Sequence, residues 1–181
     1  MAVNDEATFG EVRLELRHGD ITAQPDVDAI VNAANAQLET GGGVAGAIHR
    51  AAGPGLAEEC RPMAPIEPGH CVISGGHDLP NGSVVHCLGP VYGRDAPADE
   101  LLASCYREGL RLADEQGLRS IAFPALSTGA FGYPMRDAAE VALRTIAEVA
   151  PQLRTVRLVR FVLHAPADLV VHREVLTDLV G

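Results

Sequence analysis

Two glycine-rich segments constrain the fold of this chain most strongly, because each follows a short apolar stretch and precedes a helix-like stretch. The first comprises residues 32–35 (NAAN) and 41–44 (GGGV), and the second comprises residues 127–134 (STGAFGYP). A helix start presents unpaired backbone N–H groups and the positive end of the helix dipole, which together attract phosphate. Two loops at two helix starts therefore predict a ligand with two phosphates, or with a phosphate and a sugar.

The stretches around these loops alternate between strand-like and helix-like patterns. A mostly parallel sheet covered by helices on both faces is the architecture that such an order favours. Both loops follow strands, so both should open at the carboxyl edge of the sheet, where ligands bind in such folds. The patterns predict strands over 12–17, 28–32, 70–74, 83–88, 119–124 and 155–163, and helices over 44–52, 54–60, 98–116, from 134 onward, and 167–179.

The charge balance excludes some classes of partner. The chain of 181 residues carries 24 acidic and 14 basic side chains, a net charge of −10. This balance argues against a broad contact with nucleic acid or an anionic membrane. It leaves room for an anionic ligand held by backbone N–H groups. The length suits one domain over residues 1–181.

The N-terminal residues and the overall hydropathy predict where the protein is located. Residues 1–10 are polar and acidic, which predicts a flexible N-terminus and no secretion signal. With no run of membrane-spanning length, we expect a cytoplasmic protein that contacts no membrane.

The seven histidines form no metal-binding pattern, so neither a metal nor a cofactor is expected. The cysteines, which lack a CxxC spacing, are expected to be reduced thiols; they are Cys60, Cys71, Cys87 and Cys105.

The first loop combines three features that suit a sugar phosphate. Asn32 and Asn35 carry amides that donate and accept, which suits sugar hydroxyls. The run from Gly41 to Gly43 lets a ligand approach the backbone closely. A helix from about Val44 supplies the dipole.

The second loop offers hydroxyls, bare backbone and an aromatic ring. Ser127 and Thr128 carry hydroxyls, for which helix capping is the alternative role. Gly129 exposes the main chain, and Phe131 is placed either to cover a ribose or to form a wall of the cleft. GxxxxGK[ST] does not occur, so the common P-loop site is not indicated.

Taken together, these segments resemble the macrodomain family, and within it the MacroD-type branch. The resemblance extends from about Leu14 to the C-terminus, and its motifs are specific in combination. It implies a three-layer α/β/α sandwich with a mixed, mostly parallel six-stranded sheet that binds ADP-ribose. The matching segments are residues 19–22, 28–35, 41–44, 46–53, 73–80, 85–90 and 121–134.

The same resemblance assigns roles along the ligand. Asp20 would accept a hydrogen bond from the adenine amine, and Ile21 would contribute to the adenine pocket. Leu163 falls where the family often has an aromatic residue against the adenine. The distal ribose would lie against Asn35, Gly41, Gly42, Gly43 and Val44. The pyrophosphate would lie against Ser127, Thr128, Gly129, Ala130 and Phe131.

One position departs from the family pattern. Hydrolases of this branch usually carry an aspartate between the valine and the glycine of the first loop, and this chain has Ala45 there. That aspartate helps to orient or activate the attacking water, and alanine can do neither. The NAAN segment, both loops and their flanking segments otherwise match the hydrolytic branch. The resemblance therefore still implies a hydrolase of ADP-ribosyl linkages, acting on mono-ADP-ribosylated carboxylates, O-acetyl-ADP-ribose or a related linkage, with Asn35 and Phe131 as its catalytic residues.

Two alternatives remain open on the sequence. One is a module that binds ADP-ribose without hydrolysing it, and the other is a hydrolase of ADP-ribose linked to nucleic acid. The expected partner is ADP-ribose or an ADP-ribosylated protein, with ADP-ribosylated nucleic acid as the further alternative. The protein is expected to act as a monomer.

Overall fold

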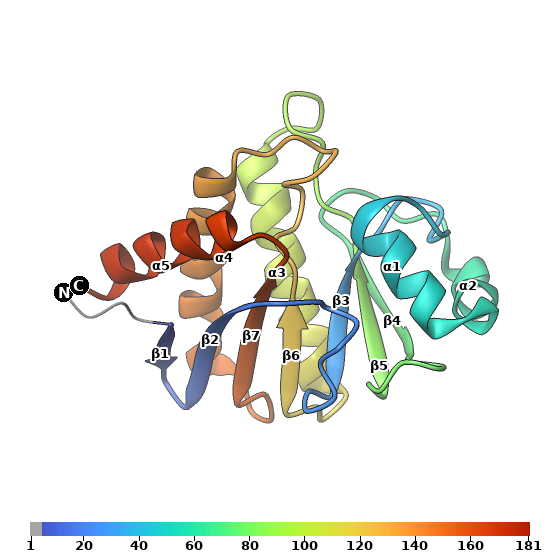
Figure 1. Ribbon diagram of the computed structural model, residues 1–181, viewed down its shortest axis with the longest axis horizontal. Helices are drawn as coiled ribbons and strands as arrows, with labels where there is room; N and C mark the ends of the chain where they lie inside the picture. The colour runs from blue at the N-terminus through green and yellow to red at the C-terminus, as the bar shows by residue number, and fades with distance from the viewer. Residues whose placement is uncertain (1–4) are drawn as a thin grey trace.

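The structure is a computed structural model that describes residues 5–181, and its centre is one mixed sheet (Figure 1). Neighbouring strands follow the order β1-β2-β7-β6-β3-β5-β4. The five inner strands are parallel to one another, whereas β1 and β4 run antiparallel at the two edges. The strands are β1 (Glu6–Phe9), β2 (Val12–His18), β3 (Ala29–Ala33), β4 (Cys71–Gly75), β5 (Ser83–Cys87), β6 (Ser120–Phe123) and β7 (Leu158–Leu163).

Helices cover both faces of the sheet, so the predicted three-layer α/β/α fold is confirmed (Figure 1). The short helices α1 and α2 pack on one face, and α3, α4 and α5 pack on the other. The helices are α1 (Gly43–Ala52), α2 (Pro54–Cys60), α3 (Ala98–Glu115), α4 (Met135–Val149) and α5 (Pro166–Val180), with 3₁₀ turns at Arg61–Met63 and Ala150–Gln152.

The central strands are apolar on both sides because both sides are covered. In β3, Ala29 and Val31 face the core beneath α3, α4 and α5, whereas Ile30 faces the core beneath α1 and α2. Side chains alternate between the faces of a strand, so a strand between two helical layers needs apolar residues at every position. This explains the uninterrupted apolar run that the sequence shows there.

The N-terminal segment corrects two predictions. Glu6–Phe9 forms β1, paired antiparallel with β2 from Glu6 opposite Glu15 to Phe9 opposite Val12. The sheet therefore has seven strands rather than six, and the prediction of a flexible segment is wrong for residues 6–9. Residues 1–4 lie outside the described part of the chain. β1 escaped notice because it is only four residues long and its side chains are exposed or half-buried.

The cysteines give a further correction. Cys71 on β4 and Cys87 on β5 form a disulfide, so the prediction of four reduced thiols is wrong for this pair. The two residues lie directly opposite each other in the antiparallel register, with their Cα atoms 4.2 Å apart. Cys60 and Cys105 are free and buried. Within the described residues, no helix has both the length and the hydropathy needed to cross a membrane.

Candidate functional site

Both glycine-rich loops open at the carboxyl edge of the parallel strands, as predicted (Figure 1). The first loop follows β3 and leads into α1, and the second follows β6 and leads toward α4. The chain leaving β2 brings Asp20 to the same edge, and β7 ends there at Leu163. Since β2, β7, β6, β3 and β5 are consecutive in the sheet, these segments form one continuous rim.

In the first loop, main-chain N–H groups are left without acceptors at the start of α1. The amides of residues 41–44 donate no hydrogen bond to any residue in the described range 5–181, and no side chain caps the helix. A Cβ added at Gly42 or Gly43 would meet no atom within 4 Å, so both face open space. Free N–H groups, open space and the dipole of α1 form a site suited to an anion.

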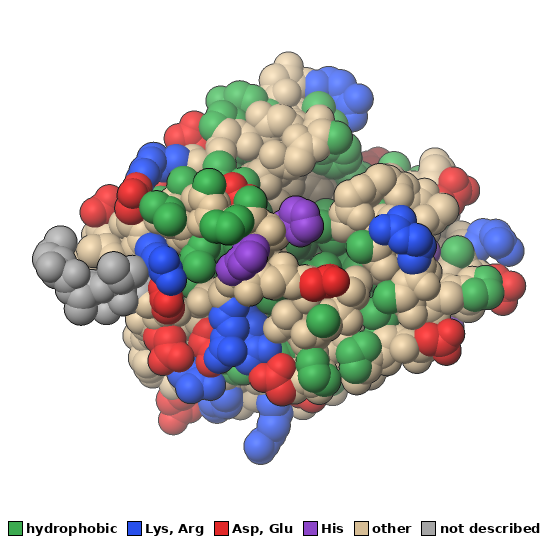
Figure 2. All heavy atoms as spheres, in the orientation of Figure 1, with side chains coloured by type: hydrophobic (Ala, Val, Ile, Leu, Met, Phe, Trp, Pro, Cys, Tyr) green, Lys and Arg blue, Asp and Glu red, His purple; other side chains and the backbone are tan. Residues whose placement is uncertain are grey.

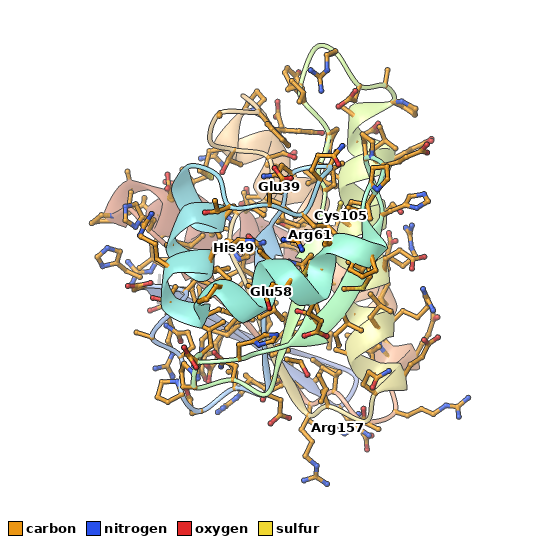
Figure 3. The ribbon with its side chains drawn as sticks, turned by 90° about the vertical axis from the view of Figure 1, so that its right-hand side faces the viewer. Glu39, His49, Glu58, Arg61, Cys105 and Arg157 are labelled. Carbon is orange, nitrogen blue, oxygen red and sulfur yellow. A yellow bond between two sulfur atoms is a disulfide. The ribbon has the colours of Figure 1, made fainter. Side chains whose placement is uncertain are left out.

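The side chain of Asn35 supports this loop. Its Nδ2 donates to the carbonyl of Glu39 at 2.8 Å, and its Oδ1 accepts the Glu39 N–H at 3.0 Å. Figure 3 shows Glu39 at the end of the molecule where this loop lies. A second Nδ2 hydrogen and a second Oδ1 lone pair remain for a ligand. At Gly46 a Cβ would lie only 2.3 Å from the Gly41 carbonyl oxygen, so the helix start needs glycine there.

The second loop turns its hydroxyls inward and leaves its amides free. Thr128 Oγ1 donates to the Ala125 carbonyl at 2.8 Å, and the Tyr133 N–H closes the turn on the Ser127 carbonyl at 2.9 Å. The N–H groups of residues 128–131 find no acceptor in the described range. A Cβ on Gly129 would again meet nothing within 4 Å. This loop therefore also offers main-chain donors to an anion.

Two details of the second loop differ from the prediction. α4 begins at Met135 with Pro134 as its N-cap, so the free amides belong to a turn and not to a helix start. Ser127 adopts a left-handed backbone with φ of 67°, and its Oγ is buried without a hydrogen-bond partner. The Ser127 Oγ lies so close to Gly89 that a Cβ added there would be only 2.1 Å from it. Ser127 thus supports the loop through its main chain and its packing.

At the β2 end of the rim, Asp20 presents a carboxylate. Its Oδ1 accepts the Thr22 N–H at 2.8 Å and the Thr22 hydroxyl at 2.7 Å. These hydrogen bonds lower the pKa of Asp20 below its ordinary value, so the side chain is ionised at neutral pH. Its other oxygen remains available as an acceptor for an amino group.

Besides Ile21 and Ser127, two more predicted site residues have buried side chains. Leu163 is 1% exposed and belongs to the core beneath α3, α4 and α5. The next residue, His164, is exposed, and its carbonyl lies 3.2 Å from Nε2 of the exposed His18. Histidine side chains gather on this face in Figure 2. The sequence reasoning overlooked this pair, although both histidines flank strands that end at the rim.

Asn32 is the second buried residue, at 1% exposure. Its Nδ2 donates to Nδ1 of His86 at 3.1 Å, and Nε2 of His86 lies 2.8 Å from Ser74 Oγ. Burial, with a smaller contribution from the nearby His49, lowers the pKa of His86 to about 4. His49 lies on α1, where its side chain is buried (Figure 3). Asn32 is therefore a neutral, hydrogen-bonded support beneath the first loop.

The position that lacks the usual aspartate lies in the first turn of α1. Ala45 is 5% exposed, and no acidic residue occupies this turn. Ile21 is buried beneath the rim, and Val44 and Phe131 are half-buried at it. Ala130 is exposed beside Phe131. The rim therefore holds an amide at Asn35 and an aromatic ring at Phe131, but no carboxylate at the start of α1.

A comparison with known protein families decides what this arrangement represents. The sequence model of the Macro domain family matches residues 31–142, which contain both loops. This chain is a macrodomain. The family membership accounts for the strand order and for the two loops at one edge, and it confirms the resemblance noted in the sequence.

Individual relatives agree with this assignment. The chain is 44% identical over 172 residues to a protein of Klebsiella pneumoniae named O-acetyl-ADP-ribose deacetylase, covering 92% of this chain and 98% of that protein. It superposes on the Oceanobacillus iheyensis macrodomain with ADP at a TM-score of 0.92, with 39% identity, covering 97% and 95%. It superposes on the Trypanosoma brucei macrodomain in complex with ADP-ribose at a TM-score of 0.84, with 37% identity, covering 93% and 69%.

Proposed function

We propose that this macrodomain binds ADP-ribose between its two glycine loops and hydrolyses ADP-ribosyl esters, including O-acetyl-ADP-ribose and mono-ADP-ribosylated carboxylates. The observation that carries the proposal is the pair of loops with unpaired amides, at residues 41–44 and 128–131, on one edge of the sheet. A diphosphate needs donors on more than one side, and these loops supply them without a lysine or arginine. The Klebsiella relative named as a deacetylase supports the choice of esters.

The ligand would run along the rim from β2 to β5. The adenine amine would donate to Asp20, with Ile21 beneath the ring. The diphosphate would bridge the free amides of the two loops. The distal ribose would then lie between Asn35 and Phe131, with the amide of Asn35 directed at its hydroxyls. Asn32 and Leu163, being buried, would shape the site from beneath rather than contact the ligand.

The reaction adds one water to one ester. Water supplies a hydroxyl to the acyl carbon and a proton to the departing ribose oxygen, so a carboxylic acid and ADP-ribose are released. Without a carboxylate at Ala45, the water would be positioned by Asn35, the loop amides and the ligand's own phosphate. A positioned base is worth roughly 10²–10⁴-fold in rate. We therefore expect turnover slower by a factor in that range than an aspartate would allow.

Ala45 also favours a second candidate, a module that binds ADP-ribose without hydrolysing it. The loops and Asp20 would serve that role unchanged, because they bind rather than react. Hydrolysis of nucleic-acid-linked ADP-ribose is a third candidate, restricted by the net charge of −10 to a short contact with a nucleic-acid end.

A release assay separates these candidates. Purified protein would be incubated with ADP-ribose attached to a carboxylate, to acetate through an ester, to serine and to a nucleic-acid end, while calorimetry measures the affinity for free ADP-ribose. We expect release from the two esters and one binding site. Asn35→Ala should reduce ester release at least tenfold with a smaller effect on affinity. Tight binding with no release over hours would select the binding module.

A further inference from the structure

A cavity of about 270 Å³ continues the rim beyond the position proposed for the distal ribose. Ala36, which follows Asn35, and Phe131 of the second loop both line it. Leu88, just after β5, also lines it, so the cavity lies at the opposite end of the strand order from Asp20 on β2. The group attached to the distal ribose would therefore point into this cavity.

The inner lining of the cavity is apolar. Ile66, Leu88 and Val91 join Ala36 and Phe131 around it, and Ile66 and Leu88 are buried. Apolar walls favour a hydrocarbon chain, since transferring it from water to such walls lowers its free energy. They offer little to a charged or strongly polar acyl group.

Backbone hydrogen bonds hold the walls in place. The Ile66 N–H donates to the Ala36 carbonyl at 2.9 Å, which joins the segment before β4 to the first loop. The Tyr92 N–H donates to the Phe131 carbonyl at 2.8 Å, which joins the segment after β5 to the second loop. The rings of Tyr92 and Tyr133 also pack together, with centroids 4.8 Å apart. The cavity is therefore preformed, which reduces the ordering cost of binding.

The charged residues of the cavity are engaged elsewhere or exposed. Asp95 accepts the Val91 N–H at 2.8 Å and lies 3.6 Å from Nε of Arg94, so its carboxylate shapes the loop. The Arg94 side chain is 73% exposed, and Glu67 is also exposed. Both of these charged side chains therefore extend into solvent and leave the buried walls of the cavity apolar.

We propose that this cavity binds the acyl chain of the substrate, and that the enzyme prefers ADP-ribosyl esters of short to medium-chain fatty acids over the acetyl ester. This proposal rests on the proposed ester hydrolysis and names its substrate class. Small-molecule pockets usually measure about 300–1,000 Å³, so a cavity of about 270 Å³ accepts a chain of several carbons but not a further nucleotide. The balanced reaction is acyl-O-ADP-ribose plus water giving the fatty acid and ADP-ribose.

The first test is a series of acetyl, butanoyl and hexanoyl esters of ADP-ribose, with kcat and KM measured for each. Burial of one methylene group corresponds to up to about fourfold in affinity. We expect kcat/KM to rise on the order of tenfold from acetyl to butanoyl. A flat or falling series in the unmodified protein would overturn the proposal.

A matched pair of variants locates the effect. Val91→Trp fills the half-buried wall of the cavity, so the advantage of butanoyl over acetyl should disappear. Val170→Trp, at an exposed position on α5 outside the cavity, adds the same bulk and should leave the series unchanged. An unchanged series in Val91→Trp would place the acyl chain elsewhere.

Amide analogues that resist hydrolysis distinguish failure of this proposal from failure of the proposed function. If esters are not hydrolysed, the affinities of acetamido, butanamido and hexanamido derivatives of ADP-ribose still report on the cavity. Tighter binding with length would support the acyl site in a protein that only binds. Equal affinities, beside tight binding of free ADP-ribose, would reject the acyl site and retain the nucleotide site.

Discussion

The two glycine loops present free amides at the same edge of the sheet but achieve this differently. In the first loop the donors, residues 41–44, lead into the first turn of α1, and the side chain of Asn35 closes the preceding turn on Glu39. In the second loop the donors belong to an irregular turn that ends before α4 begins at Met135. The first loop is thus held by regular structure and the second by packing, although both leave main-chain N–H groups free.

The two loops also differ in backbone strain. The first has a positive φ of 56° at Gly43, where glycine adopts it without steric cost, and one of 57° at Leu38, where the side chain makes it unfavourable. The second places a positive φ of 67° at Ser127, whose hydroxyl is buried without a partner against Gly89. A non-glycine residue in this region costs about 1–3 kcal/mol. Each loop therefore holds one strained non-glycine residue, and in the second loop the unpaired Ser127 hydroxyl adds to the cost.

The largest expected effect is loss of binding when the second loop is blocked. In Gly129→Glu a carboxylate would enter open space beside the free amides, where it would repel a diphosphate and occupy its place. Like charges at close range cost several kcal/mol, so the affinity for ADP-ribose should fall at least about 100-fold by calorimetry.

Gly82→Glu is the matched control, since a Cβ there also meets nothing within 4 Å and Gly82 lies in the loop before β5. It should bind ADP-ribose normally, and both variants should keep the parent Tm. Normal binding by Gly129→Glu would mean that only the first loop holds the phosphates.

The next largest expected effect concerns Ala45, the position where hydrolases of this family usually have an aspartate. Ala45→Asp places a carboxylate in the first turn of α1, where the helix dipole favours it. A base that positions water should raise the rate of ester release by about 100-fold, at the lower end of the usual range for such catalysis. The affinity for ADP-ribose should change little. Ala51→Asp carries the same charge in the last turn of α1 and should leave the release rate unaltered.

The smallest expected effects are changes in the free energy of unfolding, which report the backbone strain in each loop. They are measured by equilibrium urea unfolding. Ser127→Gly removes both the unfavourable φ and the unpaired hydroxyl, so it should raise the free energy of unfolding by about 1 kcal/mol, after the entropic cost of glycine. Gly43→Ala introduces the same kind of backbone strain in the first loop, so it should lower the free energy of unfolding by about 1–2 kcal/mol. Lower stability of Ser127→Gly would mean that Ser127 makes a favourable contact in its place.

The sequence predicted most helices and strands correctly, because helix starts and runs of apolar residues are signals that extend over only a few residues. The prediction of a helix over 54–60 is confirmed, since Pro54 suits a first helical turn. The apolar run before Asn32 predicted a buried strand because both faces of β3 are covered. The start of β7 was placed too early, at residue 155 rather than 158. There the N–H groups of Thr155 and Val156 donate to Asp114 of α3 instead of to a strand.

The properties that the sequence did not reveal depend on residues distant along the chain. Asn32 is buried because His86 of β5, 54 residues away, provides its partner. Cys71 and Cys87 form a disulfide because the β4–β5 register places them opposite each other. Leu163 packs into the core and leaves the exposed position at the end of β7 to His164.

The sequence by itself determined the kind of fold and the location of the two loops, because hydrophobic periodicity and glycine placement act over a few residues. Only the tertiary structure decided which atoms of those loops are free. The hydroxyls of Ser127 and Thr128 turn inward while the amides of residues 128–131 remain unpaired. Whether a polar group is satisfied depends on partners that folding brings from elsewhere in the chain, and these loops therefore present main-chain rather than side-chain donors.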